Sequence, residues 1–566
     1  MTRRIEIEST KKQAIETART RLLIGGALMA AAFFVVGVRL FDLVVFNENE
    51  SQRRAASREI VRPATMSRAD IVDRNGVLLA TSLSTASLFA NPRKISDPAS
   101  AAARLVEILP DLSEEVIAAR LAADKGFVWL RRNLTPTQQF EINRLGIPGF
   151  DFEAEERRVY PHGRLAGHIV GFTNIDNAGL AGIEQSMDSA ITGNAGPLKL
   201  SIDIRVQQIA RQELSDQIDK FKAIGGGAIV LDARTGEVVS MVSLPDFDPN
   251  DPARAPDETR FNRNTLGVYE LGSVFKIFNH AIALETGAAN MAKSYDATKP
   301  IKISRFRISD YHPENRWLTV PEIFKLSSNI GSAKMALDIG SENQRKYLGH
   351  LGLLRRTSIE LPEQALPMYP ARWRDINTMT ISYGHGIAVS PLHLVSAVAA
   401  TVNGGILRPA TLVRAKSTET GGVQVFSAET SDNIRRLLRL VVENGTGRNA
   451  SAPGYLVGGK TGTAEKQVNG RYKRNALISS FVGVFPSTEP RFVVYVMLDE
   501  PKGIRESFGY ATGGWTAAPV VGGIIQRMAP LFGIAPLDET APDIVRALNV
   551  NASAGATART RPHATN

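Results

Sequence analysis

The sequence contains no cysteine, so disulfide bonds, thiolate metal sites and cysteine nucleophiles are all excluded. It also has little excess charge, since 67 basic residues against 57 acidic ones give a formal net charge of +10. Such a mild excess is ordinary for a protein surface, and we expect no nucleic-acid partner. With 566 residues, 43% of them hydrophobic, the chain is long enough for three or four domains. Its composition excludes a wholly disordered chain, a collagen-like fibre and a multi-span membrane protein.

A single hydrophobic run is long enough to cross a membrane. Residues 22–38 carry no charge, and extension through residues 40–46 reaches the roughly 30 Å of a bilayer core. Six Lys and Arg residues precede the run, so the positive-inside rule predicts a cytoplasmic tail over 1–21 and a transmembrane helix over 22–46. The alternative, a cleaved signal peptide, would have a shorter apolar core and a small-x-small cleavage site.

The remainder of the chain, placed outside the membrane, divides into two regions and a tail. Residues 47–197 mix strand and helix patterns, with a hairpin signal at Asn75-Gly76 and helical periodicity over 100–146, and show no cluster of reactive residues. Residues 198–535 alternate hairpins with helices, which predicts an antiparallel sheet covered by helices and an α+β fold class. Residues 536–566 are poor in large apolar residues and predict a disordered tail.

Several elements of the second region can be placed by pattern. A hairpin is expected over residues 227–242, and a strand pair over residues 480–498. Helices are predicted over residues 273–285, 321–337, 390–402 and 433–442.

Without cysteine, a nucleophile must be serine, threonine, lysine or a carboxylate. Ser273 and Lys276 stand three residues apart and share one helix face, where the amine can approach the hydroxyl. Apolar neighbours such as Phe275 would exclude water and lower the pKa of Lys276, so that the amine could accept a proton. The eight histidines form neither a G-x-S-x-G elbow nor a metal-ligand spacing.

Two further motifs carry candidate chemistry. Ser327-Ser328-Asn329 follows an apolar helical stretch, so that Ser327 could relay a proton and Asn329 could hold an amide. Ser431-Asp432-Asn433 has the same S-x-N pattern and is predicted instead as the N-cap of the helix that follows. Lys460-Thr461-Gly462-Thr463 occurs once, in a strand-like stretch that offers a cation, hydroxyl groups and a backbone N–H to an anionic peptide end.

Together and in this order, the S-x-x-K, S-x-N and K-T-G motifs resemble those of the penicillin-binding protein and serine β-lactamase superfamily. Residues 68–80 resemble the first N-terminal motif of class B penicillin-binding proteins, except that Ala69 stands where that motif has glycine. Residues 158–163 and 179–184 resemble the second and third of these motifs. No N-terminal glycosyltransferase domain is recognisable, which disfavours class A.

Within class B, three stretches look like those of the septal cell-division transpeptidase (FtsI) family: residues 310–331, 382–394 and 458–472. The resemblance implies a pedestal over 47–197 and a transpeptidase domain over 198–535. It implies a protein of the bacterial plasma membrane at the division septum, with an extracytoplasmic catalytic domain. Its implied partners are the septal glycan polymerase FtsW and other divisome proteins.

The resemblance also implies roles for the motif residues. Ser273 would attack the penultimate D-Ala carbonyl of a peptidoglycan stem peptide, with Lys276 as general base. Ser327 would relay a proton to the leaving amine, Asn329 would hold the substrate amide and Lys460 would give electrostatic support. A β-lactam would acylate the same serine.

The K-T-G motif would bind the substrate through Thr461, Gly462 and Thr463, with the two threonines on the terminal carboxylate. The backbone N–H groups of Ser273 and Thr463 would form the oxyanion hole. No metal or cofactor is implied. The alternatives left open are an elongation-specific transpeptidase, a D,D-carboxypeptidase, and a non-enzymatic β-lactam sensor or divisome scaffold.

Overall fold

The computed structural model describes residues 19–21, 23–39, 68–193, 196–303, 306–415, 421–468 and 471–548. It divides the chain into two compact units, Met1–Met66 and Ser67–Asn566. In the first unit, helix Arg19–Arg39 has a mean hydropathy of 2.1, and it is the one helix in the described residues long and apolar enough to cross a membrane. It coincides with most of the predicted span, whose residues 40–46 lie outside the described part of the chain.

The larger part of the second unit is built on a five-stranded antiparallel sheet in the order β14-β15-β16-β6-β7. Its strands are β6 (Gly225–Asp232), β7 (Val238–Leu244), β14 (Gly458–Val468), β15 (Arg471–Phe485) and β16 (Phe492–Asp499). Every residue of β6, β7 and β16 is buried, because helices cover both faces of the sheet. The predicted antiparallel sheet covered by helices is therefore confirmed.

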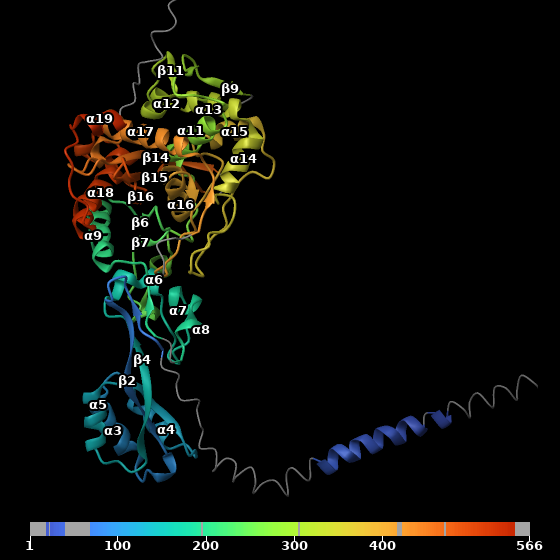
Figure 1. The fold of residues 1–566 in the computed structure, drawn as a ribbon. Coiled ribbons are helices and arrows are strands. Elements are labelled where there is room, and N and C mark those ends of the chain that lie inside the picture. The colour runs from blue at the N-terminus through green and yellow to red at the C-terminus, as the bar shows by residue number, and fades with distance from the viewer. Residues whose placement is uncertain are drawn as a thin grey trace, which may run out of the picture. The chain divides into compact units, whose positions relative to one another are not determined.

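Two layers of helices enclose this sheet (Figure 1). Helices α9 (Ile204–Phe221) and α18 (Gly513–Met528) pack on one face, and their apolar residues form one core with the sheet. Helices α16 (Pro391–Val402) and α17 (Ala428–Asn444) pack on the other face, and α11 (Lys276–Glu285) lies against both of them. Strand β14 is at the edge of the sheet, which leaves one side of its backbone available to other groups.

Shorter elements complete this part of the chain. They are η3 (Pro252–Arg254), α10 (Asp257–Arg260), η4 (Gly272–Phe275), β8 (Ser294–Asp296), β9 (Ile301–Ile303), β10 (Phe306–Ile308), β11 (Trp317–Thr319), α12 (Val320–Leu326), α13 (Asn329–Ile339), α14 (Ser341–His350), α15 (Asp375–Ile381), β12 (Ile406–Leu407), β13 (Val423–Gln424), η5 (Arg448–Ala450), η6 (Arg505–Ser507), η7 (Ala529–Phe532) and α19 (Pro542–Leu548).

Three sequence predictions need correction here. The helix expected over 321–337 is two helices, α12 and α13, because Ser327 adopts a left-handed conformation with φ 59° and ends the first. The N-cap of α17 is Ser427, whose Oγ accepts from the Thr430 amide, so the Ser431 triplet lies inside the helix. Residues 536–548 are ordered, since Glu539 pairs with Arg439 at 2.7 Å and α19 follows; residues 549–566 lie outside the described residues.

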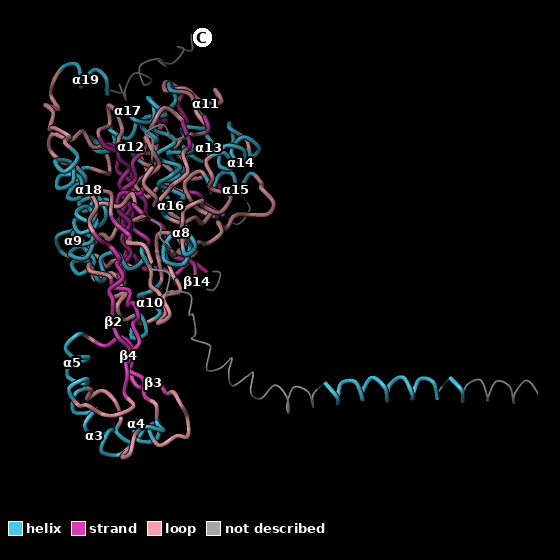
Figure 2. The backbone as a smooth tube through the Cα atoms, turned by 60° about the horizontal axis from the view of Figure 1, so that its bottom comes forward, coloured by secondary structure: helices cyan, strands magenta, loops and turns pink. Residues whose placement is uncertain are grey.

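The pedestal region has a sheet of its own, in the order β3-β2-β1-β5 with β4 also paired to β2 (Figure 2). The antiparallel pairing of β1 and β2 confirms the hairpin at Asn75-Gly76, whereas strand β3 interrupts the helical stretch expected over 100–146. The elements are β1 (Ile71–Val72), β2 (Leu78–Ala90), η1 (Pro92–Lys94), α3 (Pro98–Ile108), α4 (Glu114–Leu121), β3 (Val128–Leu134), α5 (Pro136–Arg144), β4 (Phe150–Val159), η2 (Gly163–Ala166), α6 (Gly167–Val170), α7 (Gly182–Ser186), α8 (Asp188–Ile191) and β5 (Leu198–Lys199).

One buried carboxylate joins the three N-terminal motifs. Glu184 is fully buried and receives the guanidinium of Arg68 on Oε2 at 2.6 Å and that of Arg158 on Oε1 at 2.7 Å. Arg158 also donates to the backbone oxygen of Ala69 at 2.9 Å. This part of the chain therefore contains a charged cluster that its sequence did not reveal, and the cluster fixes segments up to 116 residues apart.

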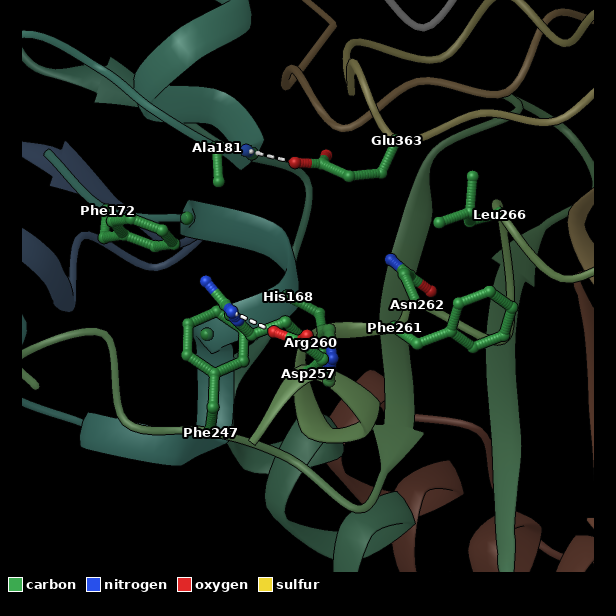
Figure 3. Close-up of a pocket in the computed structure, with 13 residues that line it drawn as sticks. His168, Phe172, Ala181, Phe247, Asp257, Arg260, Phe261, Asn262, Leu266 and Glu363 are labelled. Atoms are coloured by element: carbon green, nitrogen blue, oxygen red, sulfur yellow. Dashed lines mark hydrogen bonds and ion pairs between the residues drawn. The ribbon is translucent and has the colours of Figure 1, made fainter. Parts of the chain in front are cut away.

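A cavity of about 370 Å³ lies where residues 167–182 meet the part of the chain built on the five-stranded sheet (Figure 3). Phe172, Phe247 and Phe261 line it, and the Gly182 amide donates to Glu363 Oε1 at 3.1 Å across the junction. None of its lining residues belongs to the three catalytic motifs. We therefore treat it as part of the joint between the two regions.

The first prediction concerns the buried ion-pair cluster of Glu184, Arg68 and Arg158. Glu184→Ala leaves the buried guanidinium of Arg158 without its counter-charge and that of Arg68 with only the half-exposed Asp188, and we expect a loss of about 3–5 kcal/mol in the free energy of unfolding. Asp188→Ala is the control, because Asp188 also pairs with Arg68 but is 46% exposed, and we expect it to cost less than about 1 kcal/mol. Denaturant unfolding measures the free energy of unfolding of both variants. An equal decrease in the two would contradict a stabilising role of the buried Glu184 carboxylate.

Candidate active site

Ser273 lies in the short helix η4, directly before α11. The backbones of strand β14 and of the loop of residues 383–386 both approach the preceding residue, Gly272, closely. Gly272 has φ +61°, and a Cβ built on it would lie 2.6 Å from Thr463 O, so only glycine fits between η4 and the edge strand β14. A Cβ on Gly384, with φ +82°, would lie 2.1 Å from Gly272 O. Two close backbone contacts thus hold Ser273 between β14 and the loop of residues 383–386.

Lys276, one turn further, is fully buried, and its Nζ contacts three residues. It lies 2.6 Å from Ser327 O and 2.7 Å from Asn329 Oδ1, two oxygens that can only accept hydrogen bonds. The hydroxyls of Ser273 and Ser327 follow at 3.0 and 3.1 Å. If the amine is neutral, its two N–H bonds are occupied by the carbonyl oxygens. Its lone pair is then left for a hydroxyl proton, which is the arrangement of a general base.

Burial disfavours the charged form of this amine. Desolvation lowers the pKa of Lys276 well below its ordinary value, the nearby charge of Lys460 lowers it further, and Asp310 opposes both. Lys460 is also fully buried, and burial lowers its pKa to about 7. Its Nζ lies 2.9 Å from Ser327 Oγ. The side chains of Ser273, Lys276, Ser327 and Lys460 therefore form one continuous chain of proton-transferring groups.

The break between α12 and α13 positions the S-x-N motif. The left-handed backbone of Ser327 turns both its carbonyl and its hydroxyl toward Lys276. Asp310 stabilises the turn, because its Oδ1 accepts from the amides of Asn329 and Ile330 at 2.6 and 2.9 Å. Its Oδ2 accepts from Ser328 Oγ at 2.7 Å. Asp310 was not predicted as a site residue; a lone aspartate 17 residues before Ser327 gives no periodic signal.

The amide of Asn329 is engaged at both ends within the protein. Its Oδ1 accepts from Lys276, and its Nδ2 donates to Ser309 O at 3.1 Å. The expected contact with a substrate amide would therefore compete with Ser309 for the Nδ2 group. The contacts present in the structure orient the amine of Lys276.

Strand β14 presents the K-T-G residues to the same site. A Cβ on Gly462 would lie 2.5 Å from Leu271 O, which explains the glycine. Thr463 Oγ1 accepts from the Gly513 amide at 3.2 Å, and Thr461 Oγ1 lies 2.9 Å from Thr446 Oγ1. Thr446 is a second residue that the sequence did not indicate, and its hydroxyl extends the polar surface formed by the two threonines.

His280, another ionisable residue beside the site, has a structural role. His280 is fully buried in α11, its Nδ1 lies 2.8 Å from Lys276 O, and burial lowers its pKa to about 3, so that the ring stays neutral. In the described part of the chain, no group of three or more His, Asp or Glu side chains is placed to hold a metal ion. The chemistry available here is thus that of a serine hydroxyl, two buried amines and backbone N–H groups.

Comparison with known proteins gives two family matches. The penicillin binding protein transpeptidase domain matches residues 226–526, and the penicillin-binding protein dimerisation domain matches residues 63–220. The chain is 40% identical over 482 residues to a probable peptidoglycan D,D-transpeptidase FtsI of Caulobacter vibrioides, which covers 82% of each chain. It is 30% identical to the peptidoglycan D,D-transpeptidase FtsI of Escherichia coli, covering 91% of this chain and 92% of the other.

The fold is similar to that of solved structures. Penicillin binding protein 3 of Mycobacterium tuberculosis, complexed with aztreonam, matches with a TM-score of 0.67 and 24% identity. The match covers 84% of this chain and 98% of that chain.

The second prediction concerns the buried amine of Lys460. Because its pKa is about 7 in the folded protein and near 10.5 when unfolded, the unfolded chain binds the extra proton between these values. The amine therefore destabilises the fold increasingly as pH falls from 10.5 to 7, by up to roughly 4 kcal/mol. We expect Lys460→Met to raise the melting temperature at pH 7, with the gain shrinking toward pH 10. A gain that does not depend on pH would contradict this account.

Proposed function

Because the chain belongs to the penicillin-binding protein family, with a transpeptidase and a dimerisation domain, we propose that it is a serine-type D,D-transpeptidase that cross-links peptidoglycan stem peptides. The observation that carries the proposal is the 3.0 Å contact between Ser273 Oγ and a buried Lys276 amine whose other partners are hydrogen-bond acceptors. Ser273 is then the nucleophile and Lys276 its general base.

In acylation, the Ser273 oxygen attacks the carbonyl of the penultimate D-Ala while its proton passes to Lys276 Nζ. The C–N bond to the terminal D-Ala breaks, and the leaving nitrogen needs a proton. Ser327 Oγ lies within 3.1 Å of both amines and can carry the proton from Lys276 to the leaving group, with Lys460 supporting the transfer. The path returns Lys276 to its neutral form, ready for the second half of the reaction.

The negative charge of the tetrahedral intermediate requires backbone donors. We assign this role to the N–H groups of Ser273 and Thr463, because the close approach of Gly272 to Thr463 brings the two backbones together. We assign the hydroxyls of Thr461 and Thr463 on β14, with that of Thr446 next to Thr461, to the terminal carboxylate of the donor peptide. A β-lactam, which mimics that peptide end, acylates the same serine.

The anchor and the relatives support a role in septum formation. Helix Arg19–Arg39 is apolar enough to anchor the chain, and the basic residues before it favour a cytoplasmic N-terminus. The relatives named peptidoglycan D,D-transpeptidase FtsI support this assignment. We propose the division septum, not the side wall, as the site of action, and the septal glycan polymerase FtsW and other divisome proteins as partners, because the sequence motifs resemble those of the septal family.

The third prediction is the direct test of the nucleophile. Wild-type protein should be labelled covalently by a fluorescent penicillin, and Ser273→Ala should abolish the labelling because the acylated oxygen is gone. Ser431→Ala, which alters the other S-x-N pattern, is the control and should label normally. Labelling of the Ser273 variant, or a folded wild type that never labels, would overturn the mechanism. Septal position of the labelled protein in cells separates this function from that of an elongation enzyme.

The fourth prediction concerns Asp310 as a positioning residue. Asp310→Ala removes both the support of the Ser327 turn and the charge that raises the pKa of Lys276, so we expect acylation to slow about 100-fold. Asp310→Asn keeps an oxygen that can accept from the two amides, so we expect it to be acylated about tenfold faster than Asp310→Ala.

The pH dependence of acylation distinguishes positioning from a purely structural role. Because Asp310→Asn removes a negative charge near Lys276, the pKa of Lys276 should fall further, and the acidic limb of the rate profile should move to lower pH. Identical profiles for the wild type and the Asn variant would show that Asp310 acts only on stability, which unfolding of both variants measures.

A further inference from the structure

The proposed transpeptidase function, on which this inference rests, requires a second substrate. That substrate is a primary amine, which is cationic at neutral pH because a lysine-like amine has a pKa near 10.4 in water. The bottom of the site already holds the two buried amines of Lys276 and Lys460, which disfavour each other's charge. Because burial disfavours positive charge in this interior, a cationic substrate will approach the site readily only if a carboxylate attracts it.

Glu270 offers such a carboxylate, three residues before the nucleophile. Its Oε1 accepts from the Gly386 amide at 2.9 Å and from Gln467 Nε2 at 3.1 Å, and Tyr472 Oη donates to its Oε2 at 3.0 Å. These neutral donors fix the carboxylate without cancelling its charge. Among the side chains that the structure describes, no Lys, Arg or His forms an ion pair with Glu270. The carboxylate is thus half-buried and held by neutral donors.

The contacts with Gly386 and Tyr472 bring the partly exposed rings of His385 and Tyr472 near this carboxylate, whereas the ring of Tyr383 beside His385 is buried. The ring of His385 lies 5.3 Å from that of Tyr383 and 6.1 Å from that of Tyr472. Burial lowers the pKa of His385, Glu270 and Glu465 oppose this shift, and the charge of Lys276 adds to it. The ring therefore lies within electrostatic reach of both the acidic rim and the catalytic amine. The neighbouring Gly384 packs directly on Gly272, which ties this rim to Ser273.

We propose that Glu270, together with the rings of His385 and Tyr472, binds the ammonium group of the acceptor substrate. The carboxylate supplies the charge, and aromatic faces attract cations in addition. Before attack, the bound ammonium loses one proton to water. The neutral nitrogen then forms the C–N bond as the bond from the carbonyl carbon to Ser273 Oγ breaks. Its second proton passes through Lys276 to that oxygen, so the serine is regenerated and one proton is released overall.

The test is Glu270→Gln, which removes the charge but keeps an oxygen for Gly386 and Gln467 and a polar group for Tyr472. The acyl-enzyme is formed from a thioester analogue of the donor and offered two acceptors. One is Nα-acetyl-lysine amide, which is cationic, and the other is hydroxylamine, which is largely uncharged at neutral pH. We expect transfer to the cationic acceptor, relative to transfer to hydroxylamine, to fall at least tenfold. Raising the salt concentration should weaken the wild type's preference and leave the variant's unchanged.

Glu429→Gln is the charge-matched control, because Glu429 is exposed on α17 and takes no part in the site. It should leave the ratio between the two acceptors unchanged. An equal loss for both acceptors in Glu270→Gln, or no loss, would overturn the assignment of Glu270. If the folded wild type forms no acyl-enzyme with either the thioester or a penicillin, the proposed function itself fails and this inference fails with it.

Discussion

The site depends on burying the amine of Lys276 where its charged form is disfavoured. A buried ammonium without a counter-ion is strongly disfavoured, so the protein surrounds Nζ with two carbonyl-type oxygens and two hydroxyls and places no carboxylate in hydrogen-bond contact with it. This constraint accounts for the break between α12 and α13, since only a left-handed Ser327 directs both of its oxygens to the amine. It also accounts for Asp310, which holds that turn from outside and acts on Lys276 only through its field.

The pedestal also buries an ionisable side chain, but there the side chain is paired with opposite charges. Glu184 is as deeply buried as Lys276, but it is paired with two guanidinium groups. A paired charge is expensive to separate, so the cluster gives rigidity and specifies which segments meet. An unpaired amine that has lost its charge is instead basic and reactive. Burial of an ionisable group therefore yields a structural joint in one region and a general base in the other, and the difference is the chemistry of the partners.

Features that depend on local spacing could be predicted from the sequence. The i, i+3 relation of Ser273 and Lys276, the hairpins and the covered antiparallel sheet all follow from patterns within a few residues. Features that depend on distant partners could not. Asp310, Thr446 and the Glu184 cluster acquire their roles only when folding brings them beside groups many residues away. The single helix expected over 321–337 failed for a related reason: its apolar periodicity continues through Ser327, while the backbone breaks there to serve Lys276.

A transpeptidase must handle two substrates of opposite charge with one serine. The donor ends in a carboxylate, and the threonine hydroxyls of β14 with the buried amine of Lys460 suit an anion. The acceptor arrives as a cation, and an interior tuned to keep amines neutral offers it no attraction. Attraction must then come from outside the buried cluster but within reach of the acyl carbonyl. The loop of residues 383–386 meets both conditions, because it packs on Gly272 and presents its amide at Gly386 to Glu270. The separation of the two charge environments keeps each substrate from occupying the place of the other.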